Sequence, residues 1–310
     1  TSFADDAAEE EAEGVLYSIL SGLAIFVLCV FAAVRTEKAR RKRILGCRPK
    51  DVPWCREIPF KGDVLQANRV LYELDGKDSK SNVASALVLR MIMDGQISVG
   101  KDSRDRTELH FNDGASLDSL PECGRELLAM MREASGKDLI LQKNEFRKWS
   151  RRHSSRLVEW NDSMLLEAAR RAADCGNMSG GRFTEQGQAE ARRTLGFRKY
   201  LKDFTLVEER NAQEVVLWKD YLVFASLYGI ADKVAKELRE INPQAFDEIV
   251  SYDYTTLNQV LYLSRVMADS ITDARTAGME TGASRGGYGG FSSFGGGGGF
   301  SGGGFGGGGR

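Results

Sequence analysis

The residue types that most often carry out chemistry in enzymes are few and scattered in this sequence. Its two histidines, His110 and His153, lack the carboxylate or second histidine at helical spacing that would form a metal motif. There is no GxSxG nucleophile motif, no phosphate-binding loop with its lysine, and no GxGxxG between a strand and a helix. These absences favour a non-enzymatic protein with no catalytic, cofactor-binding or metal-ligating residues. An enzyme site assembled only by folding stays an alternative.

The cysteines show no metal or disulfide pattern either. They are scattered without CxxC spacing, one inside an apolar stretch and four in the part expected to face the cytosol. Thiols stay reduced in the cytosol, so we expect no disulfide framework. The five are Cys29, Cys47, Cys55, Cys123 and Cys175.

The strongest signal in the sequence is the uncharged stretch of twenty residues at 15–34. A helix of that length covers roughly 30 Å, the hydrocarbon thickness of a bilayer. Residues 1–14 carry six acidic side chains and no base, whereas residues 35–43 carry six bases and one acid. The positive-inside rule therefore predicts one span in the plasma membrane, with the N-terminus outside and most of the chain cytoplasmic. The charge step and the length argue against a buried helix and a cleaved signal peptide.

Residues 35–59 are the predicted basic juxtamembrane connector. Its bases are expected to contact the membrane surface, where anionic lipid attracts them. Three prolines further along predict extended backbone, because proline disfavours helical conformation in the residue before it. Trp54 and Phe60 are expected to dock the connector on the next domain. The predicted membrane-surface contacts are Arg35, Lys38, Arg40, Arg41, Lys42 and Arg43.

Residues 60–115 have the pattern of two helices followed by a β-hairpin. Gly62 and Asp63 predict the start of the first helix, and apolar residues at helical spacing follow them. Ser81 or Asn82 predicts the start of the second helix. Two short β-type runs around a charged turn complete the outline. This order predicts a winged-helix-like subdomain.

DNA binding by this subdomain is an alternative reading, and nucleic acid is an unlikely partner. A nucleic-acid reader needs a one-sided basic surface for its phosphate contacts. The second helix offers only Lys80 and Arg90, and the charged turn mixes Asp102 and Asp105 with its bases. A protein-interaction or structural role is favoured.

Residues 116–275 are the predicted helical cytosolic region, with helices throughout 117–175. Around His153 the bases gather into a stripe, which is either a solvated helix face or a contact for a partner or the membrane surface. These bases are Lys143, Arg147, Lys148, Arg151, Arg152 and Arg156.

The most apolar stretch of the predicted soluble body is residues 214–239. We predict a buried core helix here, since a helix lying in the membrane interface normally shows a long basic face. Its expected packing partners are the aromatic segment 197–204 and the amphipathic helix at 257–267. The residues that share one face at three- and four-residue steps are Trp218, Tyr221, Leu222, Ala225 and Tyr228.

Residues 286–310 contain sixteen glycines in twenty-five positions. Such a segment has no core to offset its backbone entropy, which predicts a flexible tail over 276–310. Its regularly placed aromatics could contact a partner or a lipid interface, or the tail could simply be solvated. They are Tyr288, Phe291, Phe294, Phe300 and Phe305.

The sequence therefore predicts a mainly α-helical protein in six parts. They are an acidic extracytoplasmic linker (1–14), a transmembrane helix (15–34), a basic juxtamembrane connector (35–59), a winged-helix-like subdomain (60–115), a helical cytosolic region (116–275) and a Gly/Phe-rich flexible tail (276–310).

Three stretches taken together resemble a known family. They are REIPFKGDVLQANRVLYEL (56–74), GFRKYLKDFTLVEER (196–210) with LWKDYLVFASLYGIADKVAKEL (217–238), and the Gly-Phe tail. They resemble the C-terminal part of the YciQ-like bacterial predicted membrane proteins, which contain a domain of unknown function. The most specific piece is the W-x2-Y-x6-YGIA run that begins at Trp218. The resemblance implies a secreted domain before the membrane helix, a cytosolic α-rich region and a Gly-rich end, and it implies no catalytic residues.

These observations favour a membrane-anchored interaction, scaffold or sensor module, whose partners are the lipid bilayer and unidentified proteins. The alternatives are a membrane-tethered transcription regulator that uses the winged-helix-like unit, and an unrecognised enzyme. No cofactor is expected.

Overall fold

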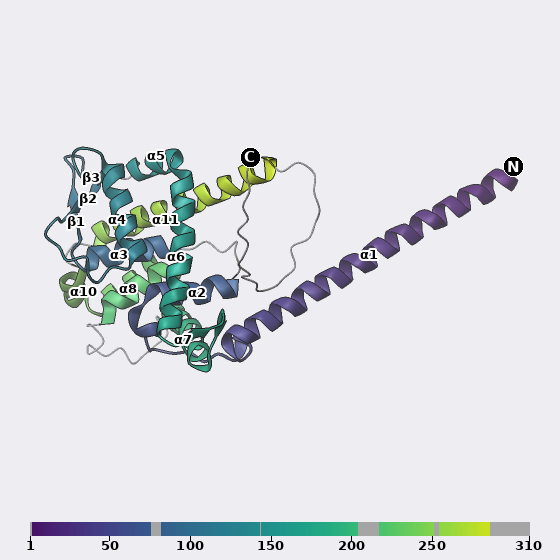
Figure 1. Ribbon diagram of the computed structural model, residues 1–310, viewed down its shortest axis with the longest axis horizontal. Coiled ribbons are helices and arrows are strands. Elements are labelled where there is room, and N and C mark those ends of the chain that lie inside the picture. The colour runs from purple at the N-terminus through teal and green to yellow at the C-terminus, as the bar shows by residue number, and fades with distance from the viewer. Residues whose placement is uncertain (1, 76–81, 143, 204–216, 251–253, 286–310) are drawn as a thin grey trace, which may run out of the picture.

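The computed structural model describes residues 2–75, 82–142, 144–203, 217–250 and 254–285. In this part of the chain the fold is mainly α-helical, with a few short strands, as the sequence predicts. One long helix, α1, extends away from a body built of the remaining helices (Figure 1). The predicted tail contacts from Tyr288 to Phe305 and the base Lys143 lie outside the described residues.

Helix α1 runs without a break over Ser2–Leu45 and contains the predicted span. Residues 2–14 of the predicted linker are therefore helical and continuous with the span, and their role as a linker stays a prediction. Alanine and glutamate, which dominate that stretch, are good helix formers, and extending an existing helix avoids the cost of nucleation. The helix also passes beyond the span and ends only where its last residues enter the body.

Two short 3-10 helices, Pro49–Asp51 and Pro59–Gly62, form the connection to the body. Phe60 is buried, and both Phe60 and Lys61 have positive φ, a conformation that costs about 1–3 kcal/mol per residue. The Glu190 carboxylate accepts a hydrogen bond from the Phe60 backbone N–H at 2.6 Å, which helps to hold this turn. The connection is thus packed against the body at Phe60.

Helix α2 (Val64–Asp75) begins at the predicted position. Asp63 Oδ1 accepts hydrogen bonds from the backbone N–H groups of Leu65 and Gln66, at 3.0 and 3.2 Å, so it caps the helix as expected. Helix α3 (Val83–Met93) follows, with Asn82 at its N-cap. The side chains of α3 are almost all buried, Arg90 excepted.

A three-stranded antiparallel sheet follows in the order β1-β2-β3. Strands β1 (Ile97–Lys101) and β2 (Thr107–Phe111) form the predicted hairpin, with Ile97 opposite Phe111. Strand β3 (Ile140–Gln142) pairs with β2 and places Leu141 opposite Leu109. Both leucines are fully buried, which explains why a short apolar run joins the sheet.

Strand β3 lies inside the stretch predicted to be helical throughout, so that part of the prediction is wrong. The helices around it are α4 (Glu122–Ser135), α5 (Glu145–Arg152) and α6 (Ser154–Asp174). A second small hairpin, β4 (Met178–Ser179) with β5 (Arg182–Phe183), also lies outside the β-hairpin that the sequence predicts within residues 60–115. Helix α7 (Glu185–Lys202) follows and begins at a Thr184 cap.

The most apolar soluble stretch forms two helices instead of one continuous helical region. Helix α8 (Trp218–Leu227) ends before Gly229, whose φ of 72° is left-handed, and α9 (Ala231–Ile241) starts just after it. Glycine adopts that conformation without steric cost, so the chain can turn there. Helices α10 (Pro243–Val250) and α11 (Tyr254–Arg285) complete the body, and α11 extends beyond the expected boundary at residue 275.

The core prediction for α8 is confirmed, because Trp218 is 2% exposed and Tyr221, Leu222 and Phe224 are fully or almost fully buried. Phe197 of α7 contacts the rings of Tyr221 and Phe224 edge-on, with centroids 5.4 and 5.7 Å apart. Such aromatic pairs add to the stability gained by burial. As predicted, α8 therefore packs against the aromatic segment of α7.

Three buried serines link the central helices. Ser85 of α3 lies 2.7 Å from Ser226 of α8 and 2.8 Å from Ser264 of α11, measured between hydroxyl oxygens. Each hydroxyl thereby has a partner, which removes most of the cost of burying it. These bonds help to fix the relative positions of the three helices.

Candidate functional site

The junction between α1 and the body is the first candidate site, because it joins the apolar helix to the folded domain. Ile44 and Leu45 are buried, whereas the large apolar side chains at 19–34 are exposed. Gln188 of α7 donates a hydrogen bond to the carbonyl of Arg43, and Arg192 donates one to the carbonyl of Leu45 at 2.7 Å. Helix α7 thus satisfies carbonyl groups that the end of α1 leaves without helical partners.

The predicted collar of bases after the span divides into two groups. Arg40 and Arg41 are half-buried and both pair with Glu37 at 2.7 Å. Arg40 also donates a hydrogen bond to the carbonyl of Leu74, at the end of α2. The hydrogen bonds that Arg40 and Arg41 donate to the Glu37 carboxylate hold the pKa of Glu37 below its ordinary value. The members that remain exposed are Arg35, Lys38, Lys42 and Arg43.

Helix α5 carries four bases of the predicted stripe, and a fifth, Arg156, lies on α6. Phe146 and Trp149 are buried on its inner side, and the ring of His153 stacks on Trp149 with centroids 4.3 Å apart. Arg156 also lies over the Trp149 ring and pairs with Glu133 of α4. The Arg156 bond holds the pKa of Glu133 below its ordinary value.

The outer side of α5 exposes four bases of the stripe. In the described part of the chain none of them forms an ion pair. Arg156 differs, because its charge is already balanced by Glu133. These four bases are exposed on one helix, and a role for them as a contact stays a prediction. The four residues are Arg147, Lys148, Arg151 and Arg152.

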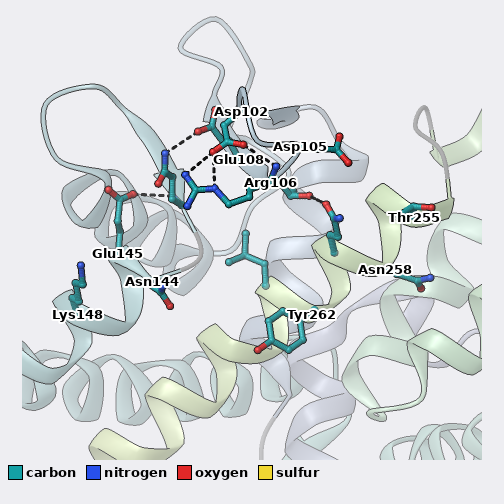
Figure 2. Close-up of a pocket in the computed structure, with 14 residues that line it drawn as sticks. Asp102, Asp105, Arg106, Glu108, Asn144, Glu145, Lys148, Thr255, Asn258 and Tyr262 are labelled. Atoms are coloured by element: carbon teal, nitrogen blue, oxygen red, sulfur yellow. Dashed lines mark hydrogen bonds and ion pairs between the residues drawn. The ribbon is translucent and has the colours of Figure 1, made fainter.

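A pocket of about 800 Å³ lies between the sheet, the start of α5 and helix α11 (Figure 2). The hairpin supplies Asp102, Arg106 and Glu108 on one wall, and α11 supplies Asn258 and Tyr262 on the other. The remaining lining residues are Asp105, Thr107, Gln142, Asn144, Glu145, Lys148, Thr255, Gln259 and Leu263.

Most charged groups of this pocket already have a partner. Arg106 pairs with Asp102 at 2.6 Å, and hydrogen bonds from the Arg106 backbone and side chain hold the pKa of that carboxyl below its ordinary value. Gln142 donates to Glu108 at 2.8 Å through its side chain and to Glu145 at 2.8 Å through its backbone N–H. The Gln142 bonds connect the sheet to the start of α5. Much of the polar lining of the pocket therefore stabilises the fold.

The groups required for metal or nucleophilic chemistry do not converge among the described residues. No group of three or more histidines, cysteines, aspartates or glutamates in that part of the chain could hold a metal ion. Burial raises the pKa of the Cys123 thiol, and nearby Glu167 raises it further, so the thiolate is disfavoured. Glu167 instead accepts hydrogen bonds from the backbone N–H groups of Glu122 and Cys123 at the start of α4.

Sequence reasoning did not find the pocket. Its walls come from the hairpin, β3, the start of α5 and α11, which are distant in the chain. The available local signal was the charged turn between β1 and β2, which was read only as a mixed surface. The pairing of β3 with β2, which brings α5 beside the hairpin, was not predicted.

The comparisons with known proteins agree with the resemblance seen in the sequence. Residues 172–238 match the family model described as "Predicted membrane protein (DUF2207) C-terminal domain". This stretch covers the end of α6 through most of α9, including the buried aromatic helix α8. No curated protein and no solved structure matches the chain.

Among the described residues, one helix is long and apolar enough to cross a membrane, by length and composition. Its apolar window lies within Ile19–Asp51, has a mean hydropathy of 2.2, and is not buried anywhere against the body. The family description and this helix agree on a membrane protein of unknown function.

Proposed function

We propose that this protein is a membrane-anchored, non-enzymatic module that presents a helical body to cytosolic protein partners. The span would lie in the plasma membrane with the N-terminus outside, as the acidic residues before it and the bases after it favour. The body would act as a scaffold, or as a sensor that responds to events on the outer side.

The observation that carries the proposal is that the C-terminal end of α1 is packed and hydrogen-bonded into the body. Leu45 is fully buried, and Arg192 and Gln188 of α7 bond the last turn of the helix. Arg40 adds a bond to the end of α2. A tilt or rotation of the span would therefore be transmitted to α2 and α7. A loose tether would give no such coupling.

The burial of α3 argues against the alternative of a DNA-binding regulator. A recognition helix must offer a row of side chains to base edges in the major groove. Helix α3 has buried side chains on all sides, and its exposed base, Arg90, pairs with Asp220 at 2.7 Å. In the hairpin, Asp102 and Asp105 pair with Arg106 and Lys101. This surface therefore has no excess of positive charge for phosphate contacts.

The topology part of the proposal is tested by cysteine labelling. A chain with its native cysteines replaced by alanine receives either Ala8→Cys or Lys219→Cys. An impermeant maleimide applied to intact cells should label position 8, whereas position 219 should react only after lysis. The reverse pattern would mean that the orientation is wrong.

The interaction part is tested by cross-linking in native membranes, followed by purification of the full chain. Leu87→Asp is the control, because it should unfold the body and leave the span intact. Discrete products that disappear in this variant would support the proposal. The same products with an unfolded body would contradict it, since the anchor alone would then explain them.

A further inference from the structure

The exposed bases of α5 form a face of their own. With about 3.6 residues per turn, Arg147, Lys148, Arg151 and Arg152 cover an arc of about 140° on the outer side of the helix. Arg147 and Arg151 are one turn apart, as are Lys148 and Arg152, so each pair can flank one phosphate group.

Acidic side chains on and beside α5 have other partners. Glu145, on α5 itself, accepts a hydrogen bond from the backbone N–H of Gln142. Glu133, on α4, pairs with Arg156. Among the described residues, no acidic side chain pairs with any of the four bases. The face therefore carries four bases without an ion pair to any described residue, although Lys148 also lines the pocket beside Glu145, and an anionic surface would complement them.

The position of α5 also favours a membrane as that surface. Helix α1 leaves the body beside α7 and slants toward the level at which α5 and the C-terminal part of α11 lie (Figure 1). Helix α5 packs against α11, whose C-terminal part lies at about the same level in this view (Figure 1). Because α1 tethers the body, even a weak attraction to the same bilayer would act at high local concentration.

We propose that α5 is a second membrane contact, at which Arg147, Lys148, Arg151 and Arg152 bind the phosphate groups of anionic lipids. The inference rests on the proposed anchoring by α1. It adds that the body lies against the inner leaflet on its α5 side. Lipid headgroups fit the observations better than an acidic protein does, because α1 holds the body next to a bilayer and the exposed bases after the span already favour anionic lipid there.

The test measures how fast Lys148 is acetylated in the full chain. The chain is placed in lipid nanodiscs made either of phosphatidylcholine alone or of phosphatidylcholine with phosphatidylglycerol. Acetylation is read by mass spectrometry after short exposure to an amine reagent. Lys148 should react about fivefold more slowly with the anionic lipid, and this protection should disappear in high salt, which screens exposed charges. Lys219, exposed on α8, is the internal reference and should react equally in both.

Two matched variants sharpen the test. R151E/R152E should abolish the difference at Lys148, whereas R104E/K236E, with the same change in charge on other exposed positions, should retain it. The wild-type comparison of lipids and salt needs no variant, so it stands if a variant misfolds. Equal acetylation of Lys148 in both lipids would overturn the inference. Protection by soluble polyglutamate without protection by the anionic lipid would also overturn it, in favour of an acidic protein partner.

The two proposals fail in different ways. If the chain does not stay with the nanodiscs, the anchoring by α1 is wrong and the inference on α5 falls with it. If the chain stays with the nanodiscs but Lys148 reacts equally, only the α5 contact is wrong.

Discussion

Two strongly apolar helices of this chain lie in opposite surroundings. The apolar side chains of α1 at 19–34 are exposed, with Leu28 at 67%, whereas Trp218 in α8 is 2% exposed. Helix α8 is short, ends at Leu227 just before Gly229, and packs against an aromatic ring of α7. Helix α1 is long enough to cross a bilayer and is bounded by opposite charges.

The comparison teaches that apolar composition alone does not locate a helix. Length and flanking charge distinguish a helix that lipid should cover from one that protein covers. A polar residue of α8 supports this distinction between a lipid-covered and a protein-covered helix. The Ser226 hydroxyl forms a hydrogen bond with the Ser85 hydroxyl of α3, and lipid chains could not supply such a partner. Substitutions in the two helices should therefore affect different quantities.

The largest effect is expected from Leu87→Asp, which places a carboxylate among fully buried side chains of α3. The change combines loss of a core side chain with burial of an unpaired charge, so the free energy of unfolding should fall by more than about 5 kcal/mol. Chemical denaturation followed by circular dichroism measures it. Leu166→Asp on α6, where Leu166 is 72% exposed, is the matched control and should change little. Similar stability of the two variants would contradict the burial of α3.

Trp218→Ala should lower the free energy of unfolding by about 3–5 kcal/mol, because it removes a large buried side chain of α8. Leu217→Ala, one residue earlier and 38% exposed, should cost much less. If both variants unfold at the denaturant concentration of the wild type, α8 is not a core helix. Binding of α8 to lipid would then become the better explanation of its composition.

Leu28→Arg changes the other apolar helix. A charged residue near the centre of a spanning helix should cost about 2.5–3.5 kcal/mol of membrane insertion. The melting temperature of the body should stay the same, since Leu28 contacts no part of it. The fraction of chain that resists alkaline extraction from membranes measures insertion, with Leu28→Ala as control. A lower melting temperature of the body together with normal membrane insertion would contradict the account, because α1 would then contribute to the folded body and would not depend on lipid.

The smallest effect is expected at Asp94, which follows the last residue of α3. Partial burial raises the pKa of this carboxyl above its ordinary value, so folding favours the protonated form. Stability should therefore fall as pH rises from the ordinary pKa of aspartate through the raised one. Asp94→Asn should be slightly more stable than wild type at pH 7 and equal to it near pH 3. The effect is small because the side chain is only partly buried and solvent screens its charge.

This prediction is checked by comparing melting temperatures of the wild type and Asp94→Asn across that pH range. A difference that is largest at low pH would have the wrong sign. Such a result would place a stabilising partner beside the ionised carboxylate.

Elements defined by local chemistry could be predicted from the sequence. The Asp63 cap and the β1–β2 hairpin depend on residues close together in the chain, so their patterns are visible there. The core face of α8 was predicted for the same reason. The continuation of α1 through residues 2–14 was missed, because acidic composition was read as solvation instead of helix formation.

Features that depend on distant segments could not be predicted in this way. Strand β3 is too short to be recognised until Leu141 lies opposite Leu109. The turn at Gly229 was passed over because apolar residues continue on both sides of it. The pocket beside α11 and the bonds from Arg192 and Gln188 to the end of α1 join residues far apart in sequence. Single-sequence patterns carry no information on such contacts.

The central claim is that lipid covers α1 and protein covers α8. Photolabelling of the full chain in nanodiscs, with lipids that carry a diazirine in the acyl chain, tests it most directly. Mass spectrometry should find the label on residues 19–34 and none on Trp218–Leu227. Label on α8 that persists in natively folded protein, or an unlabelled α1, would contradict the account.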